Sequence, residues 1–262
     1  MTTPMLTEPT GLSLQRLAEQ SWERFGGASR LHFEHQSFTG LELAARLRRL
    51  AQGLRDIGLR PGERVVVCMA NCPEVGLTYS AVWRAGGATT PVLFLLSEEE
   101  LRHVLRDSEA AYVVTTPEFL PKVVASAAGV ETLRGVVLAG PAPAESVGVP
   151  LFDFAELERA DESVLVERDP SDLAALLYTG GTTGRSKGVM LSHDALSAAA
   201  WAAVAAGRQT GEPPTSVSLL PLPLSHVYGL TVSVMGLHAT EPGTSVLMRW
   251  FDPAGWLSLA AQ

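Results

Sequence analysis

The chain has 262 residues, of which 46% are hydrophobic and 18% are charged, and its formal net charge is −8. This length and apolar content predict one large folded domain or two small ones, and they exclude a largely disordered chain. The negative charge argues against nucleic acid or an anionic membrane as the main partner.

The first ten residues, MTTPMLTEPT, have neither the basic nor the apolar region of a signal peptide.

Helix and strand signals alternate along the first half of the chain. Thr39 and Glu42 form a capping box before leucines at helical spacing, and Gly58 ends that helix. Ser97 and Glu100 form a second capping box and predict another helix. Apolar runs predict strands at residues 65–69, 90–96, 111–116 and 135–140. Helices are expected to begin near Pro73 and after Pro117. The proline-rich residues 141–150 predict a surface loop.

The second half continues the alternation. Runs at residues 173–179 and 188–193 predict two strands that flank a Gly/Thr-rich loop. Ser192 is the expected N-cap of an alanine-rich helix that Gly207 ends. Its apolar tract, residues 195–206, is shorter than the roughly 20 residues of a membrane span, so we expect a buried helix. Further strands are expected at residues 216–222 and 244–248, and Asp252 with Pro253 predicts a last helix.

This order of elements predicts an α/β fold with largely parallel sheets flanked by helices. Neither an internal repeat nor a low-complexity linker divides the chain. Gln262 lies about three turns into the last expected helix, without a stop signal, which is compatible with a fragment of a larger domain.

The strongest chemical signal is YTGGTTGRSKG, residues 178–188. Its glycines lack Cβ atoms, so backbone amides can close on an anion. Four hydroxyl side chains add donors, and one lysine adds a positive point charge. A purely structural turn needs neither, so the segment predicts a polyphosphate site. The expected nucleotide-binding residues are Thr179, Gly180, Gly181, Thr182, Thr183, Gly184, Ser186 and Lys187.

Other interpretations of this segment are weaker. The spacing fits neither a Walker A loop nor G-x-G-x-x-G, which disfavours a P-loop NTPase and a dinucleotide dehydrogenase. GRSKG does match G-x-S-x-G, the nucleophile elbow of α/β-hydrolases, with Ser186 as nucleophile. Asp194 and then His226 or His238 follow in the order of a triad. However, the elbow needs a strand directly before the serine and a helix directly after it, whereas a Gly/Thr-rich loop and a strand-like run stand there.

The same segment closely resembles the core signature of the acyl-adenylate-forming enzymes, usually YTSGTTGxPKG. This superfamily of AMP-dependent synthetases and ligases includes acyl-CoA synthetases, adenylation domains of peptide synthetases and luciferases. Gly180 replaces the usual serine and Ser186 the usual proline, and both changes bear on nucleotide binding. The runs FTGLELAARLRRLAQGLRDIGLRPGERVVVCMANCPE, LSEEELRHVLRDSEAAYVV and LLPLPLSHVYGL resemble further family segments, so nearly all of the chain is covered in family order.

The resemblance implies an AMP-forming acyl-CoA ligase. Such an enzyme activates a carboxylic acid with ATP and Mg²⁺, and then passes the acyl group to a thiol of CoA or of a carrier protein. By motif position, residues 180–187 wrap the β- and γ-phosphates and Lys187 neutralises the leaving pyrophosphate. The resemblance also places His226, Tyr228 and Gly229 beside the acyl pocket, although a lone histidine in an apolar segment is often only a core residue.

The family segments that hold adenine, ribose and magnesium, and the small C-terminal domain with the catalytic lysine, have no counterpart in residues 1–262. The resemblance thus makes the chain the N-terminal part of the AMP-binding large domain, with no catalytic residue and no metal ligand, and inactive in isolation. The alternative is a non-catalytic binding or assembly module of the same fold. A homo-oligomer stays open.

The chain has two cysteines, Cys68 and Cys72, which are too few for a disulfide framework. They lie four residues apart without a neighbouring histidine, so we expect structural residues and not metal ligands. Free cysteines fit a reducing compartment. We therefore expect a cytoplasmic protein that neither spans a membrane nor binds nucleic acid.

Overall fold

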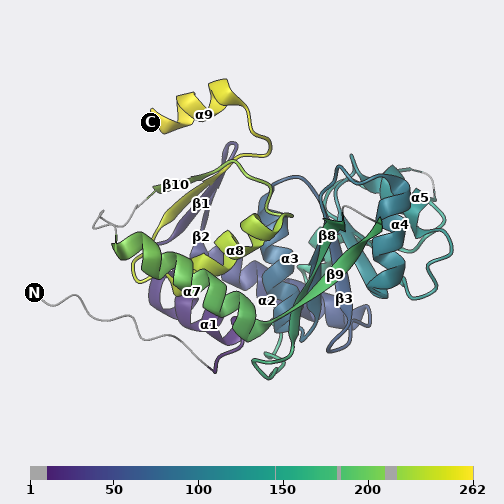
Figure 1. Cartoon of the computed structure of the whole chain (residues 1–262), viewed down its shortest axis with the longest axis horizontal. Helices are drawn as coiled ribbons and strands as arrows, with labels where there is room; N and C mark the ends of the chain where they lie inside the picture. The colour runs from purple at the N-terminus through teal and green to yellow at the C-terminus, as the bar shows by residue number, and fades with distance from the viewer. Residues whose placement is uncertain (1–10, 145, 182–183, 210–216, 262) are drawn as a thin grey trace, which may run out of the picture.

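The computed structural model describes residues 11–144, 146–181, 184–209 and 217–261. It contains two sheets with helices packed around them (Figure 1). The expected α/β architecture with largely parallel sheets is confirmed.

The larger sheet has seven strands in the order β7-β6-β5-β3-β4-β8-β9. All neighbours pair in parallel except β8 and β9, which form an antiparallel hairpin at one edge. The central strands are apolar and buried, as strands covered by helices on both faces must be. The bounds are β3 Arg64–Cys68, β4 Ala88–Pro91, β5 Ala110–Thr115, β6 Gly135–Leu138, β7 Leu151–Asp153, β8 Leu173–Gly181 and β9 Gly184–Ser192.

The smaller sheet has four strands in the order β10-β11-β1-β2. Its members are β1 Arg30–Phe33, β2 Gln36–Thr39, β10 Val217–Leu220 and β11 Thr244–Leu247. Only β1 and β2 are antiparallel, and β1 pairs in parallel with β11 from the far end of the chain. β10 and β11 were predicted from the sequence, whereas β1 and β2 were not.

Local signals set the starts of several helices. The reciprocal bonds of a capping box are present at Thr39 and Glu42 and at Ser97 and Glu100. The last helix begins after Asp252, whose carboxylate accepts from the Gly255 amide at 2.7 Å. The helices are α1 Leu14–Phe25, α2 Gly40–Asp56, α3 Pro73–Arg84, α4 Glu98–Asp107, α5 Leu120–Ala127, α6 Phe154–Leu157, α7 His193–Gln209, α8 Val227–Met235 and α9 Pro253–Ala260, and a short 3₁₀ helix, η1, covers Gly236–His238.

Alternate residues of β3 face two separate cores. Val65 and Val67 pack in the cluster that contains α2 and α3, and this cluster also includes residues of the four-stranded sheet. Val66 and Cys68 pack in the second cluster, with α4 and α5. Because successive side chains of a strand point to opposite faces, this alternation places helices on both sides of the seven-stranded sheet. In Figure 1, α4 and α5 lie together at the right, beside β9.

Three expectations about element bounds are wrong. The strand expected at residues 90–96 is β4, which ends at Pro91, because proline has no amide hydrogen for a sheet ladder. The Gly/Thr-rich segment expected as a loop is mostly paired strand. The alanine-rich helix α7 continues past Gly207 to Gln209.

Helix α7 is also less buried than expected. Along its described side chains, Leu196, Ser197 and Ala200 are buried, whereas most of its other alanines are exposed or half-buried. Such a helix is amphipathic and covers a sheet with one face. In the part of the chain that the structure describes, no helix combines the length and the apolar content needed to cross a bilayer.

Candidate functional site

The β8–β9 hairpin carries the expected nucleotide-binding segment at the edge of the seven-stranded sheet. Thr179 is directly opposite Lys187, and Gly181 is opposite Gly184. Gly180 and Ser186 also lie within the paired strands, so six of the eight expected nucleotide-binding residues belong to a hairpin whose backbone is partly used in strand pairing. Thr182 and Thr183, expected as hydroxyl donors, lie outside the described residues.

Gly180 sits at an irregularity of the hairpin, where the register shifts between Thr179 and Gly181. It is exposed, and a Cβ atom added there meets nothing within 4 Å. The serine that is usual at this position in the resembling family therefore fits without a clash. Glycine at this position lacks the serine hydroxyl, and the packing around it does not require a glycine.

One face of the hairpin lies against α4. The opposite face is buried at Leu177 and exposed at Thr179 and Lys187, and we call this exposed part the free face. Directly opposed residues of an antiparallel pair point to the same side, so Tyr178 shares a side with Gly188, and Thr179 with Lys187. The Tyr178 hydroxyl donates to Oδ2 of Asp107 on α4 at 2.6 Å. Burial, together with the Asp107 carboxylate, raises the pKa of Tyr178, so the phenol stays protonated and keeps donating.

On the free face, Thr179 and Lys187 are both exposed. Among the described residues, no carboxylate pairs with the Lys187 ammonium, and no group bonds to the Thr179 hydroxyl. An alcohol and a cation thus stand side by side, unsatisfied by the protein, on a strand pair that ends in glycines. This arrangement fits a multiply charged anion such as a phosphate chain.

The second expected group, His226 to Gly229, begins helix α8. His226 is exposed and acts as the N-cap, with Nδ1 accepting from the Tyr228 amide at 3.3 Å. The Tyr228 side chain is 55% exposed. The structure therefore does not make His226 a buried core residue, and both side chains stay accessible to a ligand.

A buried asparagine holds the segment that leads into α8. Nδ2 of Asn71 donates to the carbonyls of Leu222 at 2.9 Å and Met248 at 3.0 Å, and its Oδ1 accepts from the Leu224 amide at 2.7 Å. The Tyr79 hydroxyl donates to the Leu224 carbonyl at 3.1 Å. Asn71 is not among the residues predicted from the sequence. A signal was present, since Asn71 stands three residues after the end of the buried parallel strand β3, and sites in such sheets lie beyond the carboxyl ends of the strands.

The two expected groups occupy different elements. The hairpin is the edge of the seven-stranded sheet, whereas α8 packs against α7. Across the described ranges, no hydrogen bond joins the hairpin to residues 226–229.

The geometry contradicts the hydrolase alternative. Ser186 lies within β9 and not at a turn between a strand and a helix, as a nucleophile elbow requires. Nε2 of His238 lies 3.2 Å from Oγ of Ser197, and both residues are buried. His238 therefore has a structural partner and is not directed to Ser186.

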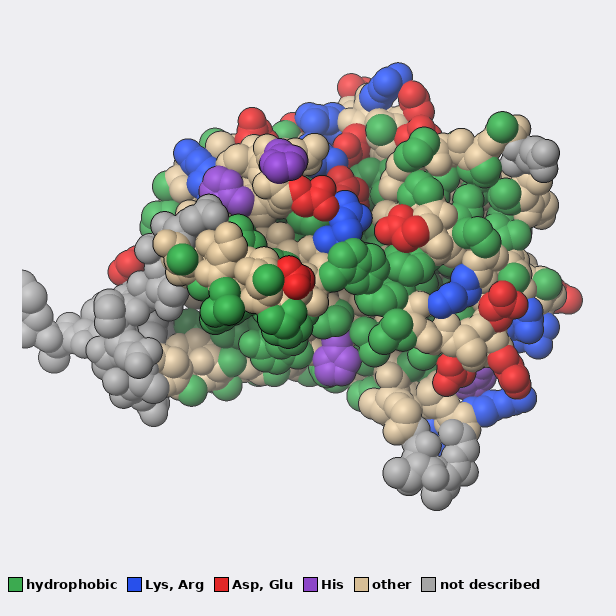
Figure 2. All heavy atoms as spheres, turned by 90° about the horizontal axis from the view of Figure 1, so that it is seen from above, with side chains coloured by type: hydrophobic (Ala, Val, Ile, Leu, Met, Phe, Trp, Pro, Cys, Tyr) green, Lys and Arg blue, Asp and Glu red, His purple; other side chains and the backbone are tan. Residues whose placement is uncertain are grey.

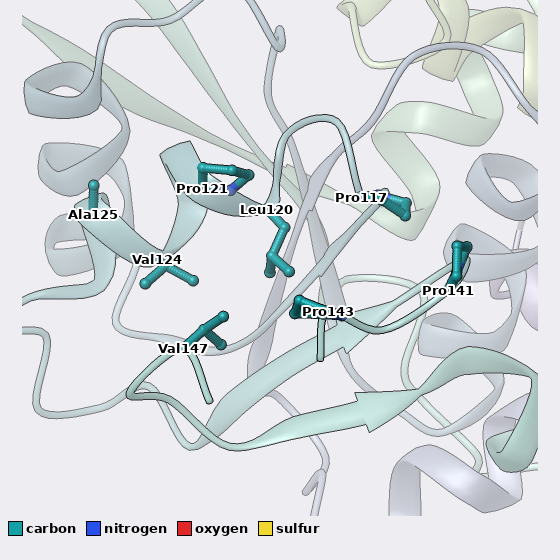
Figure 3. Close-up of a pocket in the computed structure, with 8 residues that line it drawn as sticks. All are labelled: Pro117, Leu120, Pro121, Val124, Ala125, Pro141, Pro143 and Val147. Atoms are coloured by element: carbon teal, nitrogen blue, oxygen red, sulfur yellow. The ribbon is translucent and has the colours of Figure 1, made fainter. Parts of the chain in front are cut away.

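An apolar hollow of about 520 Å³ lies between α5 and the proline-rich loop (Figure 3). It is lined by Pro117, Leu120, Pro121, Val124, Ala125, Pro141, Pro143 and Val147. None of these side chains carries a charge or a hydrogen-bond donor, so the hollow is unsuited to a phosphate chain. It contains none of the expected site residues.

A broad apolar surface lies on the face that carries α9. Figure 2, which looks onto this face, shows apolar side chains gathered across its middle. Phe251 is 62% and Leu257 is 64% exposed, and no residue of α9 is buried. We call Trp250, Phe251, Trp256, Leu257 and Leu259 the α9 surface.

Comparison with known proteins gives a consistent picture. A family model described as "AMP-binding enzyme" matches residues 18–260 of the chain. The feruloyl-CoA synthase of an Amycolatopsis species is 36% identical over 226 residues, which are 86% of this chain and 42% of that protein. The long-chain-fatty-acid–CoA ligase of Bacillus subtilis is 30% identical over 94% of this chain and 48% of its own length. The solved structure of ATP-bound MatB from Rhodopseudomonas palustris superposes with a TM-score of 0.79 at 31% identity, covering 96% of this chain and 48% of MatB. The chain thus spans less than half the length of these relatives.

Proposed function

The chain belongs to the AMP-binding enzyme family, and on that premise we propose that it is the N-terminal part of the AMP-binding large domain of an AMP-forming acyl-CoA ligase. In the proposed reaction, a carboxylate oxygen of the substrate attacks the α-phosphorus of ATP, and pyrophosphate leaves. The thiol of CoA or of a carrier protein then attacks the acyl carbon and displaces AMP, which gives a thioester. The names of the feruloyl-CoA and long-chain-fatty-acid relatives support this reaction class.

The observation that carries the proposal is the free face of the hairpin. Lys187 and Thr179 are exposed, directly opposed and without protein partners among the described residues. The similarity to a MatB structure that contains ATP supports a nucleotide as the anion. We assign the β- and γ-phosphates to the segment from Gly180 to Lys187, and the assignment includes Thr182 and Thr183 by their place in the motif.

Lys187 has the electrostatic role in this scheme. Negative charge builds up on the pyrophosphate as the bond to the α-phosphorus breaks, and a fixed cation stabilises that charge more than it stabilises bound ATP. The Thr179 hydroxyl adds a hydrogen bond to a phosphate oxygen. The Ser186 side chain alternates with that of Lys187 along β9 and lies on the side of α4, so Ser186 is assigned to the nucleotide only as part of the backbone of the segment. His226, Tyr228 and Gly229 are assigned to the acyl pocket, where the exposed Tyr228 ring offers an apolar wall and a hydroxyl.

Magnesium is proposed to accompany ATP, because Mg²⁺ is usually bound through substrate phosphates and one or two carboxylates. Within the described ranges, no three His, Cys, Asp or Glu side chains lie close enough to hold a metal ion. The carboxylate ligand is assigned to the family segment for adenine and magnesium, which has no counterpart in residues 1–262. A role in fatty acid metabolism, a cytoplasmic location and a homo-oligomer belong to the same proposal.

The test measures carboxylic-acid-dependent exchange of pyrophosphate into ATP by the complete protein. Lys187→Ala should lower the exchange rate about 100-fold, the cost typical of removing one charge-stabilising donor. The other lysine of the chain, Lys122 on α5, donates to the Phe94 carbonyl, and Lys122→Ala serves as the matched control with an unchanged rate.

An exchange rate that Lys187→Ala leaves at the wild-type value would contradict the assignment of the hairpin. The isolated chain of residues 1–262 should show no exchange, since the ribose, magnesium and C-terminal lysine groups are assigned elsewhere. Acid-dependent exchange by the isolated chain would refute that part of the proposal.

A further inference from the structure

Helix α4 contacts the β8–β9 hairpin through a histidine that the proposed reaction does not use. Nε2 of His103 lies 2.8 Å from the backbone oxygen of Ser186. A carbonyl oxygen only accepts hydrogen bonds, so the proton of this contact is on Nε2 of the imidazole. The Ser186 carbonyl belongs to the same peptide unit as the Lys187 amide. The contact therefore fixes the backbone directly before Lys187.

A second contact one turn along α4 fixes the other strand. Asp107, four residues after His103 and on the same side of the helix, accepts from the Tyr178 hydroxyl at 2.6 Å. The rings of His103 and Tyr178 also meet edge to face, with centroids 6.2 Å apart. Helix α4 thus holds β9 at Ser186 and β8 at Tyr178.

The position of the hairpin in the sheet explains why such contacts matter. β9 is the last strand in the order of the seven-stranded sheet, and among the described residues no further strand supports its outer side. Helix α4 is itself firmly anchored, because Leu101, Val104 and Leu105 are buried in the second core. A rigid helix therefore supports an edge strand next to the lysine.

We propose that His103 is a positioning residue that sets the place of Lys187, and so the grip on the triphosphate, through its hydrogen bond to the Ser186 carbonyl. The inference rests on the proposed function. His103 does not touch the phosphates in this scheme, and its effect passes through the backbone of β9.

Three variants separate the hydrogen bond from general packing. His103→Phe keeps a ring against Tyr178 but removes the donor. His103→Gln keeps a donor near the position of Nε2. Arg102→Leu is the matched control, because Arg102 on the same helix donates at 2.6 Å to the Ala125 carbonyl on α5 and not to the hairpin.

In the complete protein, His103→Phe should lower kcat/KM for ATP in the exchange assay by about three- to tenfold, the effect of losing one hydrogen bond. KM for the carboxylic acid should stay unchanged. His103→Gln should restore kcat/KM for ATP to within about twofold of wild type, and Arg102→Leu should stay within the same range. In the isolated chain, hydrogen exchange at the amides of residues 184–188 should be faster in His103→Phe than in Arg102→Leu.

The outcomes distinguish the two proposals. If Lys187→Ala lowers the exchange rate but His103→Phe behaves like Arg102→Leu in both assays, the positioning role is wrong and the proposed function stands. If Lys187→Ala has no effect, the proposed function fails, and faster amide exchange in His103→Phe still reports the contact itself. If His103→Phe does not fold, His103→Gln decides, because a loss of kcat/KM as large as tenfold in this donor-retaining variant overturns the inference.

Discussion

Gly229 allows α8 to begin in direct contact with the backbone that leads into it. A Cβ atom at this position would lie 2.3 Å from the Pro223 carbonyl oxygen and 2.4 Å from Cα of Leu224. Both neighbours are backbone atoms, and Leu224 is held by Asn71 and Tyr79, so they cannot move aside cheaply.

Gly229→Ala is therefore expected to lower the free energy of unfolding by about 1–3 kcal/mol, the usual cost of overpacking. Urea unfolding of the 262-residue chain, followed by circular dichroism, measures this change. Gly236, at the other end of α8, is the control, since an added Cβ there meets nothing within 4 Å. Gly236→Ala should change the free energy by less than about 0.5 kcal/mol. Equal midpoints for the two variants would show that the contact does not constrain α8.

The residues of the candidate site differ in how far the sequence identifies them. The 178–188 segment and residues 226–229 carry their chemistry in local motifs, and the hairpin presents Thr179 and Lys187 together. Asn71 and His103 act on backbone atoms 151 and 83 residues away along the chain, and nothing in their local sequence names those partners. Such contacts become visible only when the topology brings the segments together.

Among the helices and strands, capping residues predicted helix starts reliably, whereas strands that depend on pairing with other segments were predicted poorly. The two capping boxes place the starts of α2 and α4 correctly, because the bonds that make them span three residues. By contrast, β1 pairs on one side with its neighbour β2 and on the other with β11 from the far end of the chain, and neither β1 nor β2 was predicted. The glycines and threonines of the β8–β9 hairpin favour a loop locally, but cross-strand pairing overrides that preference.

Helices α1 and α7 are joined through a buried histidine. Nδ1 of His193, the first residue of α7, accepts at 3.3 Å from the amide of Leu14, the first residue of α1. This bond satisfies one of the amides that a helix start leaves without a partner. Burial, and secondarily Arg168 nearby, lowers the pKa of His193 to about 4 from the ordinary value of 6.5.

This pKa predicts how stability depends on pH. Between pH 4 and 6.5 the unfolded chain binds a proton at His193 that the folded chain does not. The contribution is therefore fully present above pH 6.5 and is lost as the pH falls toward 4, by about 2 kcal/mol between pH 7 and pH 5. His193→Asn keeps an acceptor near Nδ1 and does not titrate, so its free energy of unfolding should fall less over this range. Burial also lowers the pKa of His238, so the free energy of unfolding of His193→Asn should still fall with decreasing pH, but less steeply. Identical pH slopes for the variant and the wild type would contradict the prediction.

Across the molecule, the two sheets share one core but leave one face uncovered. Phe33 and Leu247 of the four-stranded sheet and Val65 of the seven-stranded sheet pack in the same buried cluster. Arg249, two residues beyond β11, donates to Glu34 at 2.8 Å and lies over the Phe33 ring. Within the α9 surface, Trp250 packs edge to face on Phe94, with ring centroids 5.0 Å apart, but no residue of helix α9 is buried. We attribute its cover to the rest of the proposed large domain, since exposed apolar patches of this kind mark contact sites.

Leu257→Glu tests this attribution by comparing the chain with the complete protein. In the chain of 262 residues Leu257 is 64% exposed, so the substitution should change the unfolding midpoint by less than about 1 °C. In the complete protein the same glutamate would be buried against apolar side chains without a partner, and the midpoint should fall by about 4 °C or more. Val164, which is 79% exposed outside the α9 surface, is the control, and Val164→Glu should be neutral in both proteins. A neutral Leu257→Glu in the complete protein would mean that the α9 surface stays open to solvent and that the proposed rest of the large domain packs elsewhere.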